Sequence, residues 1–204
     1  LMNLNSVYIF THDSIYLGED GPTHQPVEHL MSLRLIPGVD VIRPANSIEV
    51  QYAYQYIFTK SNNPKSLVLT RQSLDYVETN LSYKNFQEGA YELIKGDDIT
   101  IFASGSEVSL AIEVSKKLKN KSVQIISTPI LNQVNTDTLT NLKINEFVFT
   151  LELGRSIGWQ DYIGKVTESF SIETFGKSAP QEDLTNYFEF SAEKIAEKIL
   201  QHIS

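Results

Sequence analysis

The stretch VYIFTHDSIYLGEDGPTHQPVE, from Val7 to Glu28, joins a short apolar run to a loop rich in titratable groups. The run Val7 to Phe10 is typical of a buried parallel strand. The loop from Thr11 to Glu28 holds two histidines and four acidic residues among glycines and prolines. Glycine permits left-handed turns and proline fixes φ, so the loop is predicted to hold one bent shape. Because loops on a rigid scaffold often carry function, this loop is a candidate site, with a solvated polar turn as the plainer alternative.

Strands and helices alternate after this loop. The expected elements are a helix from Pro26 to Leu35, a strand from Val39 to Arg43, a helix capped by Ser47 and a strand from Ser66 to Thr70. Such alternation favours right-handed crossovers and a largely parallel sheet, in which ligands bind at the carboxyl ends of the strands. His12 follows the first strand and Arg71 follows the third, so both are expected at one edge of the sheet.

A polar stretch divides the chain into two parts. Residues 77–88 lack periodicity and are predicted to be an interdomain linker between a unit at 1–76 and a unit at 89–204. In the second unit the expected strands are Ala90 to Ile94, Ile99 to Ala103, Val123 to Ser127 and Phe147 to Leu151, and the expected helices follow Ser106, span Thr136 to Leu142 and follow Ser191. The predicted fold class is therefore α/β, with two consecutive units and largely parallel sheets.

The composition excludes several classes of protein. The net charge is −8 and no basic stripe exists, so a nucleic-acid-binding surface is not expected. The chain has no cysteine, which removes disulfides, thiolate nucleophiles and cysteine metal sites. No apolar run reaches the roughly 18 residues of a membrane helix, so no membrane partner is expected. Residues 1–5 are predicted to be the end of a helix, which indicates a piece of a longer protein.

Four side chains could face one ligand: His12, Asp20, His24 and Arg71. Arginine presents a planar, permanently charged fork that suits a phosphate or a carboxylate. A nearby histidine donor would help to hold the same anion, and an aspartate accepts hydrogen bonds from sugar hydroxyls. The set would suit a phosphorylated polyol, although loop residues of these types also commonly face solvent.

Other polar groups are interpreted as structural. Glu28 is expected to complement a helix dipole and His29 to lie on the surface. The segment Gly105 to Glu107 opens a helix and is expected to cap it rather than to bind phosphate, because it lacks the lysine and glycines of a P-loop. Glu152 to Gly154 and Trp159 are expected to pack near a domain or subunit boundary.

Four motifs in order resemble the transketolase family. They are THDSIYLGEDGPTHQPVEHLMSLRLIPGVDVIRPAN at 11–46, LTRQ at 69–72, ASGSEVSLA at 103–111 and FGKSAP at 175–180. The resemblance implies the second half of a pyrimidine-binding domain at 1–76 and a transketolase C-terminal domain at 89–204. The family's residues for thiamine diphosphate and its metal, Mg²⁺ or Ca²⁺, have no counterpart here. No cofactor or metal ligand is therefore assigned to this chain, which is not expected to bind the cofactor alone.

The resemblance implies a role for each candidate site residue. His12 is similar to a histidine that contacts the sugar phosphate, and Arg71 to its arginine partner. Asp20 is similar to the aspartate that reads the C2 hydroxyl of the aldose acceptor. His24 is similar to a histidine beside the reacting carbon, and is the one catalytic residue implied. Tyr16 departs from the family, which usually has glycine or another small residue at this position.

The expected activity is transfer of a two-carbon ketol unit from a ketose phosphate to an aldose phosphate, as in the pentose phosphate pathway. The family implies a homodimer in the cytoplasm, or in a plastid if a transit peptide lies upstream. It also implies that this chain needs the amino-terminal part of the same protein, and that the fragment alone is inactive. The alternative is a non-catalytic dimerisation or docking module. Another thiamine enzyme, such as a deoxyxylulose-phosphate synthase or a dehydrogenase β subunit, is disfavoured because those families do not carry GEDGPTHQP followed by FGKSAP.

Overall fold

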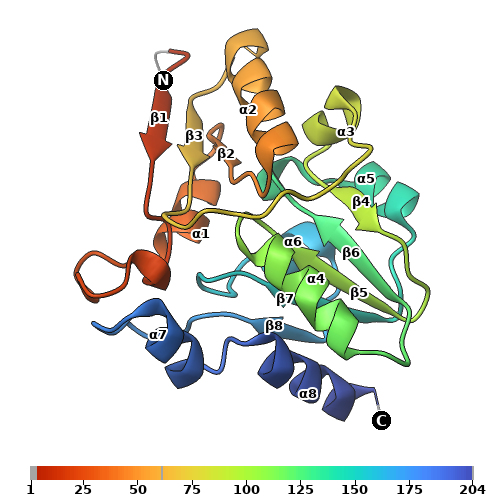
Figure 1. Cartoon of the computed structure of the whole chain (residues 1–204). Coiled ribbons are helices and arrows are strands. Elements are labelled where there is room, and N and C mark those ends of the chain that lie inside the picture. The colour runs from red at the N-terminus through yellow and green to blue at the C-terminus, as the bar shows by residue number, and fades with distance from the viewer. Residues whose placement is uncertain (1–3, 61, 204) are drawn as a thin grey trace.

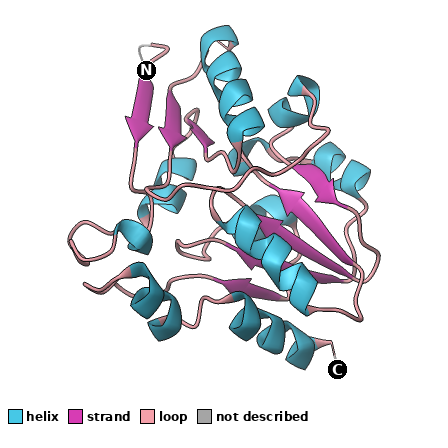
Figure 2. Ribbon diagram, viewed as in Figure 1, coloured by secondary structure: helices cyan, strands magenta, loops and turns pink. Residues whose placement is uncertain are grey.

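The computed structural model describes residues 4–60 and 62–203, which form two sheets flanked by helices (Figures 1 and 2). The first sheet has the order β1-β3-β2, and both pairs are parallel. Its elements are β1 Val7–Phe10, the 3-10 helix η1 Ile15–Leu17, α1 His29–Arg34, β2 Asp40–Ile42, α2 Ser47–Thr59 and β3 Lys65–Val68. The candidate loop leaves this sheet at the carboxyl end of β1.

The second sheet has five strands in the order β4-β6-β5-β7-β8. Its elements are α3 Tyr83–Gln87, β4 Tyr91–Ile94, β5 Ile99–Ala103, α4 Glu107–Lys117, β6 Val123–Ser127, η2 Leu131–Gln133, α5 Thr136–Leu142, β7 Phe147–Leu151, α6 Trp159–Ile163, β8 Glu168–Phe170, α7 Gln181–Tyr187 and α8 Ala192–His202. Only β4 pairs antiparallel in this sheet of the described chain. The prediction of an α/β fold with two largely parallel sheets is confirmed.

The three inner strands of the second sheet, β5, β6 and β7, are buried on both faces because helices cover both. Ile99 and Ile101 of β5 pack in the cluster that contains α4 and α8, whereas Phe102 packs with Trp159 of α6 on the opposite face. This alternation follows from the two-residue period of a strand. A third apolar cluster joins the two units, since it includes Ile57 of α2 and Tyr91 of β4.

Several predicted boundaries differ from the structure. The helix expected at Pro26 begins at His29, and α2 is capped by Asn46 rather than Ser47, because the Asn46 side chain accepts hydrogen bonds from the amides of Ile48 and Glu49 at 3.0 Å. Ser106 stands at the cap position of α4 but makes no capping hydrogen bond, because its own backbone is already helical.

Other elements were not predicted. Within the stretch predicted as a linker, α3 forms and buries Phe86 in the shared apolar cluster. The elements α6, β8 and α7 were not predicted either. The predicted helix end at residues 1–5 falls largely outside the described residues, and Leu4 and Asn5 are not helical.

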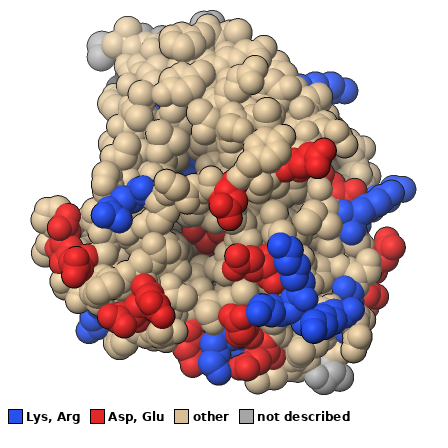
Figure 3. All heavy atoms as spheres, in the orientation of Figure 1, with Lys and Arg blue, Asp and Glu red and all other residues tan. Residues whose placement is uncertain are grey.

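Strand β1 is parallel as predicted, but its side chains are exposed rather than buried. Val7, Tyr8, Ile9 and Phe10 are 42–53% exposed, because β1 pairs only with β3 among the described strands and has no layer over it. The rings of Tyr8 and Phe10 stack, with centroids 6.3 Å apart. Figure 3 shows that the part of this face over β1, β3 and α2 carries few charged groups, which lie instead over the loop after β1 and over the second unit.

Candidate functional site

The loop after β1 holds a single bent shape through consecutive turns. His12 has φ +63°, in the left-handed region, and Ser14 accepts a hydrogen bond from the Tyr16 amide at the start of η1. The amide of Gly21 then donates to the Gly18 carbonyl, and the amide of His24 to the Gly21 carbonyl at 3.0 Å. The glycines supply the positive φ values that these turns need, so the predicted bent loop is confirmed.

Three of the four candidate residues line one hollow of about 1040 Å³. His12, Asp20 and His24 are exposed around it. Apolar side chains complete its wall: Phe10, Leu17, Leu30, Leu33, Ile36, Val68 and Phe175. A hollow with a largely apolar wall that also carries polar groups is typical of a small-molecule site.

Both histidines use one ring nitrogen in a contact with the adjacent threonine. The Nδ1 atom of His12 pairs with the Thr11 hydroxyl at 2.9 Å, and Nδ1 of His24 pairs with the Thr23 hydroxyl at 3.0 Å. Within residues 4–60 and 62–203, neither Nε2 atom makes a hydrogen bond. Each Nε2 is therefore available as a donor or an acceptor, according to the tautomer.

Arg71 lies on the same edge of the sheet but does not line the hollow. The amide of Leu69 bonds to the Phe10 carbonyl at 2.8 Å, so the segments that follow β1 and β3 leave the sheet together. Gln72 ties the Arg71 loop to η1 by donating to the Tyr16 carbonyl at 2.7 Å. The shared edge predicted for His12 and Arg71 is confirmed, whereas the ligand-binding roles of the four residues stay predictions.

Tyr16 contacts the second unit. Its hydroxyl pairs with the Thr185 hydroxyl of α7 at 2.9 Å. Burial raises the pKa of the phenol, so the group is neutral and keeps its proton for this contact. The large side chain at this position therefore anchors the loop to α7.

The FGKSAP segment holds the candidate loop from the side of the second unit. Gln25 donates through Nε2 to the carbonyls of Gly18 and Lys177, each at 2.8 Å, and the Ser178 hydroxyl bonds to the Glu19 carbonyl. Phe175, which is 77% exposed, lines the hollow. All four predicted site residues lie in the first unit, so this contribution of the second unit was not predicted. The glycine, serine and proline of the motif were the only local signal.

A buried ionic cluster lies behind the loop and joins the two units. Its members are Asp13, Arg34, Arg43, Glu107 and Glu152. Arg34 donates to both carboxylate oxygens of Glu152 at 2.7 Å. Arg43 donates to Asp13 Oδ2 at 2.7 Å and to Glu107 Oε2 at 2.5 Å. Trp159 is buried and donates to Glu152 at 3.2 Å, and the Arg34 guanidinium of the first unit lies 5.7 Å from its ring, which confirms that this segment packs at the boundary between units.

The charges in the ionic cluster shift one another's pKa values. Burial opposes the charge on Arg43, but Asp13, Glu107 and Glu152 outweigh it and raise the pKa of the guanidinium. Burial also opposes the charge on Glu152, yet Arg34 foremost, and then Arg43, lower its pKa to about 2. Burial raises the pKa of Glu107, and Arg43 offsets this only in part. Glu107 therefore takes up a proton more readily than Glu152.

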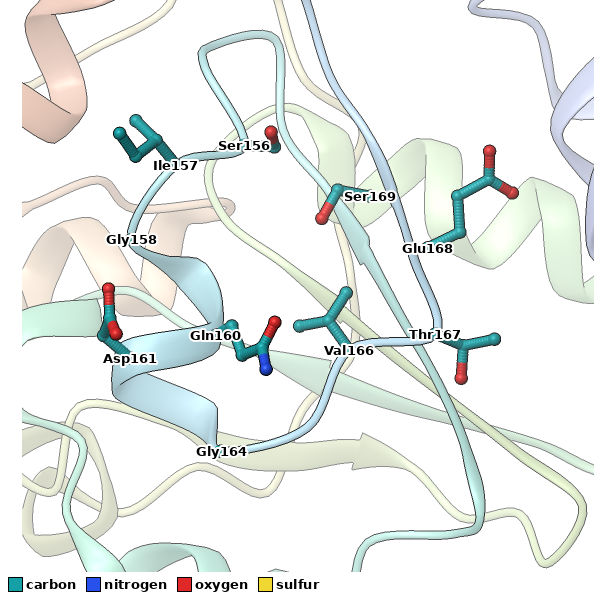
Figure 4. A pocket seen from close by; sticks show the side chains of 10 residues that line it. All are labelled: Ser156, Ile157, Gly158, Gln160, Asp161, Gly164, Val166, Thr167, Glu168 and Ser169. Atoms are coloured by element: carbon teal, nitrogen blue, oxygen red, sulfur yellow. The ribbon is translucent and has the colours of Figure 1, made fainter.

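A second hollow, of about 730 Å³, lies between α6 and β8. Figure 4 shows that its two acidic side chains, Asp161 and Glu168, lie on opposite sides. Nothing in it brings titratable groups together. In the described part of the chain, no group of three His, Asp or Glu side chains is arranged to hold a metal ion. No helix among these residues is long and apolar enough to cross a membrane.

Comparison with known proteins defines the class of these two units. The family described as "Transketolase, pyrimidine binding domain" matches residues 1–76, and "Transketolase-like TK C-terminal domain" matches residues 89–191. The class is thus a pyrimidine-binding domain followed by a transketolase-type C-terminal domain. The chain belongs to the transketolase family.

Relatives extend well beyond the matched region. The transketolase of Staphylococcus aureus (strain MW2) is 36% identical over 213 residues, which cover 98% of this chain and 32% of that protein. The transketolase of Aquifex aeolicus (strain VF5) is 35% identical, with 98% and 31% covered. The chain therefore spans about a third of the length of the curated relatives it matches.

Solved structures agree with the fold. Transketolase from Leishmania mexicana has a TM-score of 0.87 at 33% identity, with 97% of this chain and 30% of that chain covered. A split gene transketolase, described as an inactive β4 tetramer, has a TM-score of 0.81 at 17% identity, with 96% and 66% covered. At this lower identity the likeness concerns the fold alone.

Proposed function

We propose that this chain supplies the sugar-phosphate-binding loop and the C-terminal domain of a transketolase, which moves a two-carbon ketol unit from a ketose phosphate to an aldose phosphate. The observation that carries the proposal is the gathering of His12, Asp20 and His24 around one hollow, with Arg71 leaving the same sheet edge. The proposed domains are residues 1–76 and 89–204, separated by 77–88.

Each polar group has a distinct proposed task. His12 and Arg71 bind the phosphate, Arg71 through its charged fork and His12 through Nε2. Asp20 accepts a hydrogen bond from the C2 hydroxyl of the acceptor. His24 donates a hydrogen bond to the donor carbonyl oxygen as negative charge develops there, which lowers the barrier for carbon–carbon bond chemistry.

The cofactor site is proposed to lie mainly outside these residues. Among residues 4–60 and 62–203, no group of three His, Asp or Glu side chains is arranged to hold a metal ion, and we assign no residue of this chain to Mg²⁺, Ca²⁺ or the diphosphate. We therefore assign the cofactor to the complete enzyme, a cytoplasmic homodimer, to which the amino-terminal part of the same protein contributes. When bound there, thiamine diphosphate supplies the carbanion chemistry, and this chain orients the sugar.

The His24→Ala variant of the complete protein tests the proposal. Turnover with a ketose phosphate and an aldose phosphate should fall about a hundredfold or more, as when a single oxyanion donor is removed. His202→Ala is the control, because His202 lies at the end of α8 and pairs with Glu168, away from the hollow. Wild-type turnover in His24→Ala would show that the assigned role is wrong.

One observation favours a second candidate, a docking module without activity of its own. Strand β1 presents four exposed apolar side chains in succession, next to the hollow. Such a strand edge is suited to pairing with another segment. Calorimetry of this chain with thiamine diphosphate and Mg²⁺ tests the docking module, which tight binding by the isolated chain would contradict. The turnover of His24→Ala separates the two candidates, because a docking module predicts no change in it.

A further inference from the structure

The backbone of His12 needs support from its surroundings. Its φ of +63° lies in the left-handed region, which is uncommon for residues other than glycine, although histidine adopts it more often than most. Such a conformation persists only where neighbouring contacts hold it. The ring of His12 is exposed and bonds only to the adjacent Thr11 hydroxyl among the described residues. The support must therefore come through the backbone on either side.

Asp13, the next residue, supplies that support. Its Oδ2 atom accepts a hydrogen bond from Nε of Arg43 at 2.7 Å, and both side chains are 1% exposed. A charge-assisted hydrogen bond of this length in a buried site fixes the aspartate in one place. Because the Asp13 backbone is thereby held, the peptide between His12 and Asp13 is held as well.

Arg43 is itself held by the second unit. Its Nη1 atom donates to the Ser104 carbonyl at 2.7 Å and to Glu107 at 2.5 Å, where β5 passes into α4. Gly105 lets the guanidinium approach this turn, since an added Cβ would lie 2.7 Å from the Arg43 Cζ atom. A continuous chain of contacts therefore runs from the turn before α4 through Arg43 and Asp13 to His12.

Arg43 also bonds to Glu107, so Arg43 keeps a carboxylate partner when Asp13 is lost, whereas Arg34 pairs with Glu152. The cluster has three carboxyl groups, Asp13, Glu107 and Glu152, against two guanidinium groups, Arg34 and Arg43. Without Asp13, two carboxylates and two guanidiniums would remain in balance. Loss of Asp13 should therefore leave the buried charges compensated, whereas loss of Arg43 would not.

We propose that Asp13 and Arg43 are positioning residues, which set the backbone of His12 for binding of the substrate phosphate, and that the second unit takes part through Ser104 and Glu107. This inference rests on the proposed phosphate-binding role of His12. It gives the C-terminal domain a part in substrate specificity, through geometry rather than contact with the sugar.

The test uses Asp13→Ala in the complete enzyme, with an unphosphorylated ketol donor held constant. KM is measured for an aldose phosphate and for the same aldose without its phosphate. A displaced His12 should raise KM for the phosphorylated acceptor about tenfold to a hundredfold, the range expected when a binding group is misplaced by about 1 Å. KM for the unphosphorylated acceptor should stay within about twofold of wild type, because it lacks the group that His12 binds.

Two further variants separate positioning from general stability. Asp13→Asn keeps an oxygen that can accept a hydrogen bond from Arg43. Its KM values for the phosphorylated and unphosphorylated acceptors should therefore stay close to those of wild type. Glu49→Gln is the matched control, because Glu49 is a buried carboxyl that bonds across the units to Tyr91 at 2.8 Å and Ser127 at 2.6 Å without touching the loop. It should change the unfolding midpoint and leave the ratio of the two KM values unchanged.

Gly105→Ala tests the same chain of contacts from the second unit. The added Cβ atom would displace Arg43, so this variant should raise KM for the phosphorylated acceptor and leave KM for the unphosphorylated acceptor unchanged. If Asp13→Ala does not fold, Gly105→Ala replaces it in the test. His12→Ala in the same assay distinguishes the positioning role of Asp13 and Arg43 from the proposed phosphate-binding role of His12. If His12→Ala changes the ratio and neither Asp13→Ala nor Gly105→Ala does, the positioning inference is overturned and the proposed function stands. If His12→Ala leaves the ratio unchanged, both are overturned.

Discussion

Replacement of Glu152 by glutamine should reveal how strongly the ionic cluster stabilises the junction of the two units. Arg34 and Arg43 hold the pKa of Glu152 at about 2, against the usual 4.5, in spite of burial. The difference between these values, at about 1.4 kcal/mol per pH unit, corresponds to about 3 kcal/mol. Loss of one partner from a buried ion pair costs a similar amount, about 3 to 5 kcal/mol. Glu152→Gln should therefore lower the free energy of unfolding by about 3 kcal/mol at pH 7.

The stability difference between wild type and Glu152→Gln should shrink at low pH. Because folding depresses the pKa of Glu152, its contribution is fully present above about pH 4.5 and is lost as the pH falls towards 2. Urea unfolding of wild type and Glu152→Gln should therefore differ by a constant amount between pH 5.5 and 7, and by progressively less below about pH 4.5. A difference below about 1 kcal/mol at pH 7, or one that grows as the pH falls, would refute the reasoning.

Three other substitutions test local features of the fold. Gly176→Ala should destabilise the chain by about 1 to 3 kcal/mol in urea unfolding, because its Cβ would lie 1.7 Å from the Gln25 Oε1 atom; no loss would mean that the FGKSAP segment does not clasp the loop. Asn46→Ala should cost about 1 kcal/mol by loss of the α2 cap, whereas Ser47→Ala should cost far less, and the reverse order in thermal unfolding would contradict the assignment. Tyr16→Phe should cost about 1 kcal/mol by loss of the bond to α7, measured by urea unfolding, and a neutral result would argue that the bond is absent in solution.

The sequence predicted best where local pattern and tertiary burial agree. Strands β5, β6 and β7 were placed with their correct ends, because they are apolar runs covered on both faces. β1 has the same pattern and was also placed correctly, yet its exposure could not be predicted. The exposure of a strand depends on which other elements pack over it, and the residues of the strand itself do not determine that.

Caps and clusters were harder to predict for a different reason. Asn46 and Ser47 are adjacent and both cap helices well, so composition alone does not choose between them. Asp13 and Glu107 were not recognised as partners of Arg43, because their contact depends on how two separate sheets are joined. The loop that carries His12 and His24 was found, since its glycines and titratable groups lie together in the sequence.

Arg71 gives the most direct test of the central proposal, that this chain binds the phosphate of a sugar substrate. In the complete enzyme, Arg71→Ala should raise KM for an aldose phosphate about tenfold to a hundredfold, the equivalent of one charge-assisted hydrogen bond. KM for the same aldose without its phosphate should not change. An equal KM increase for both acceptors, or no increase for either, would contradict the proposed function.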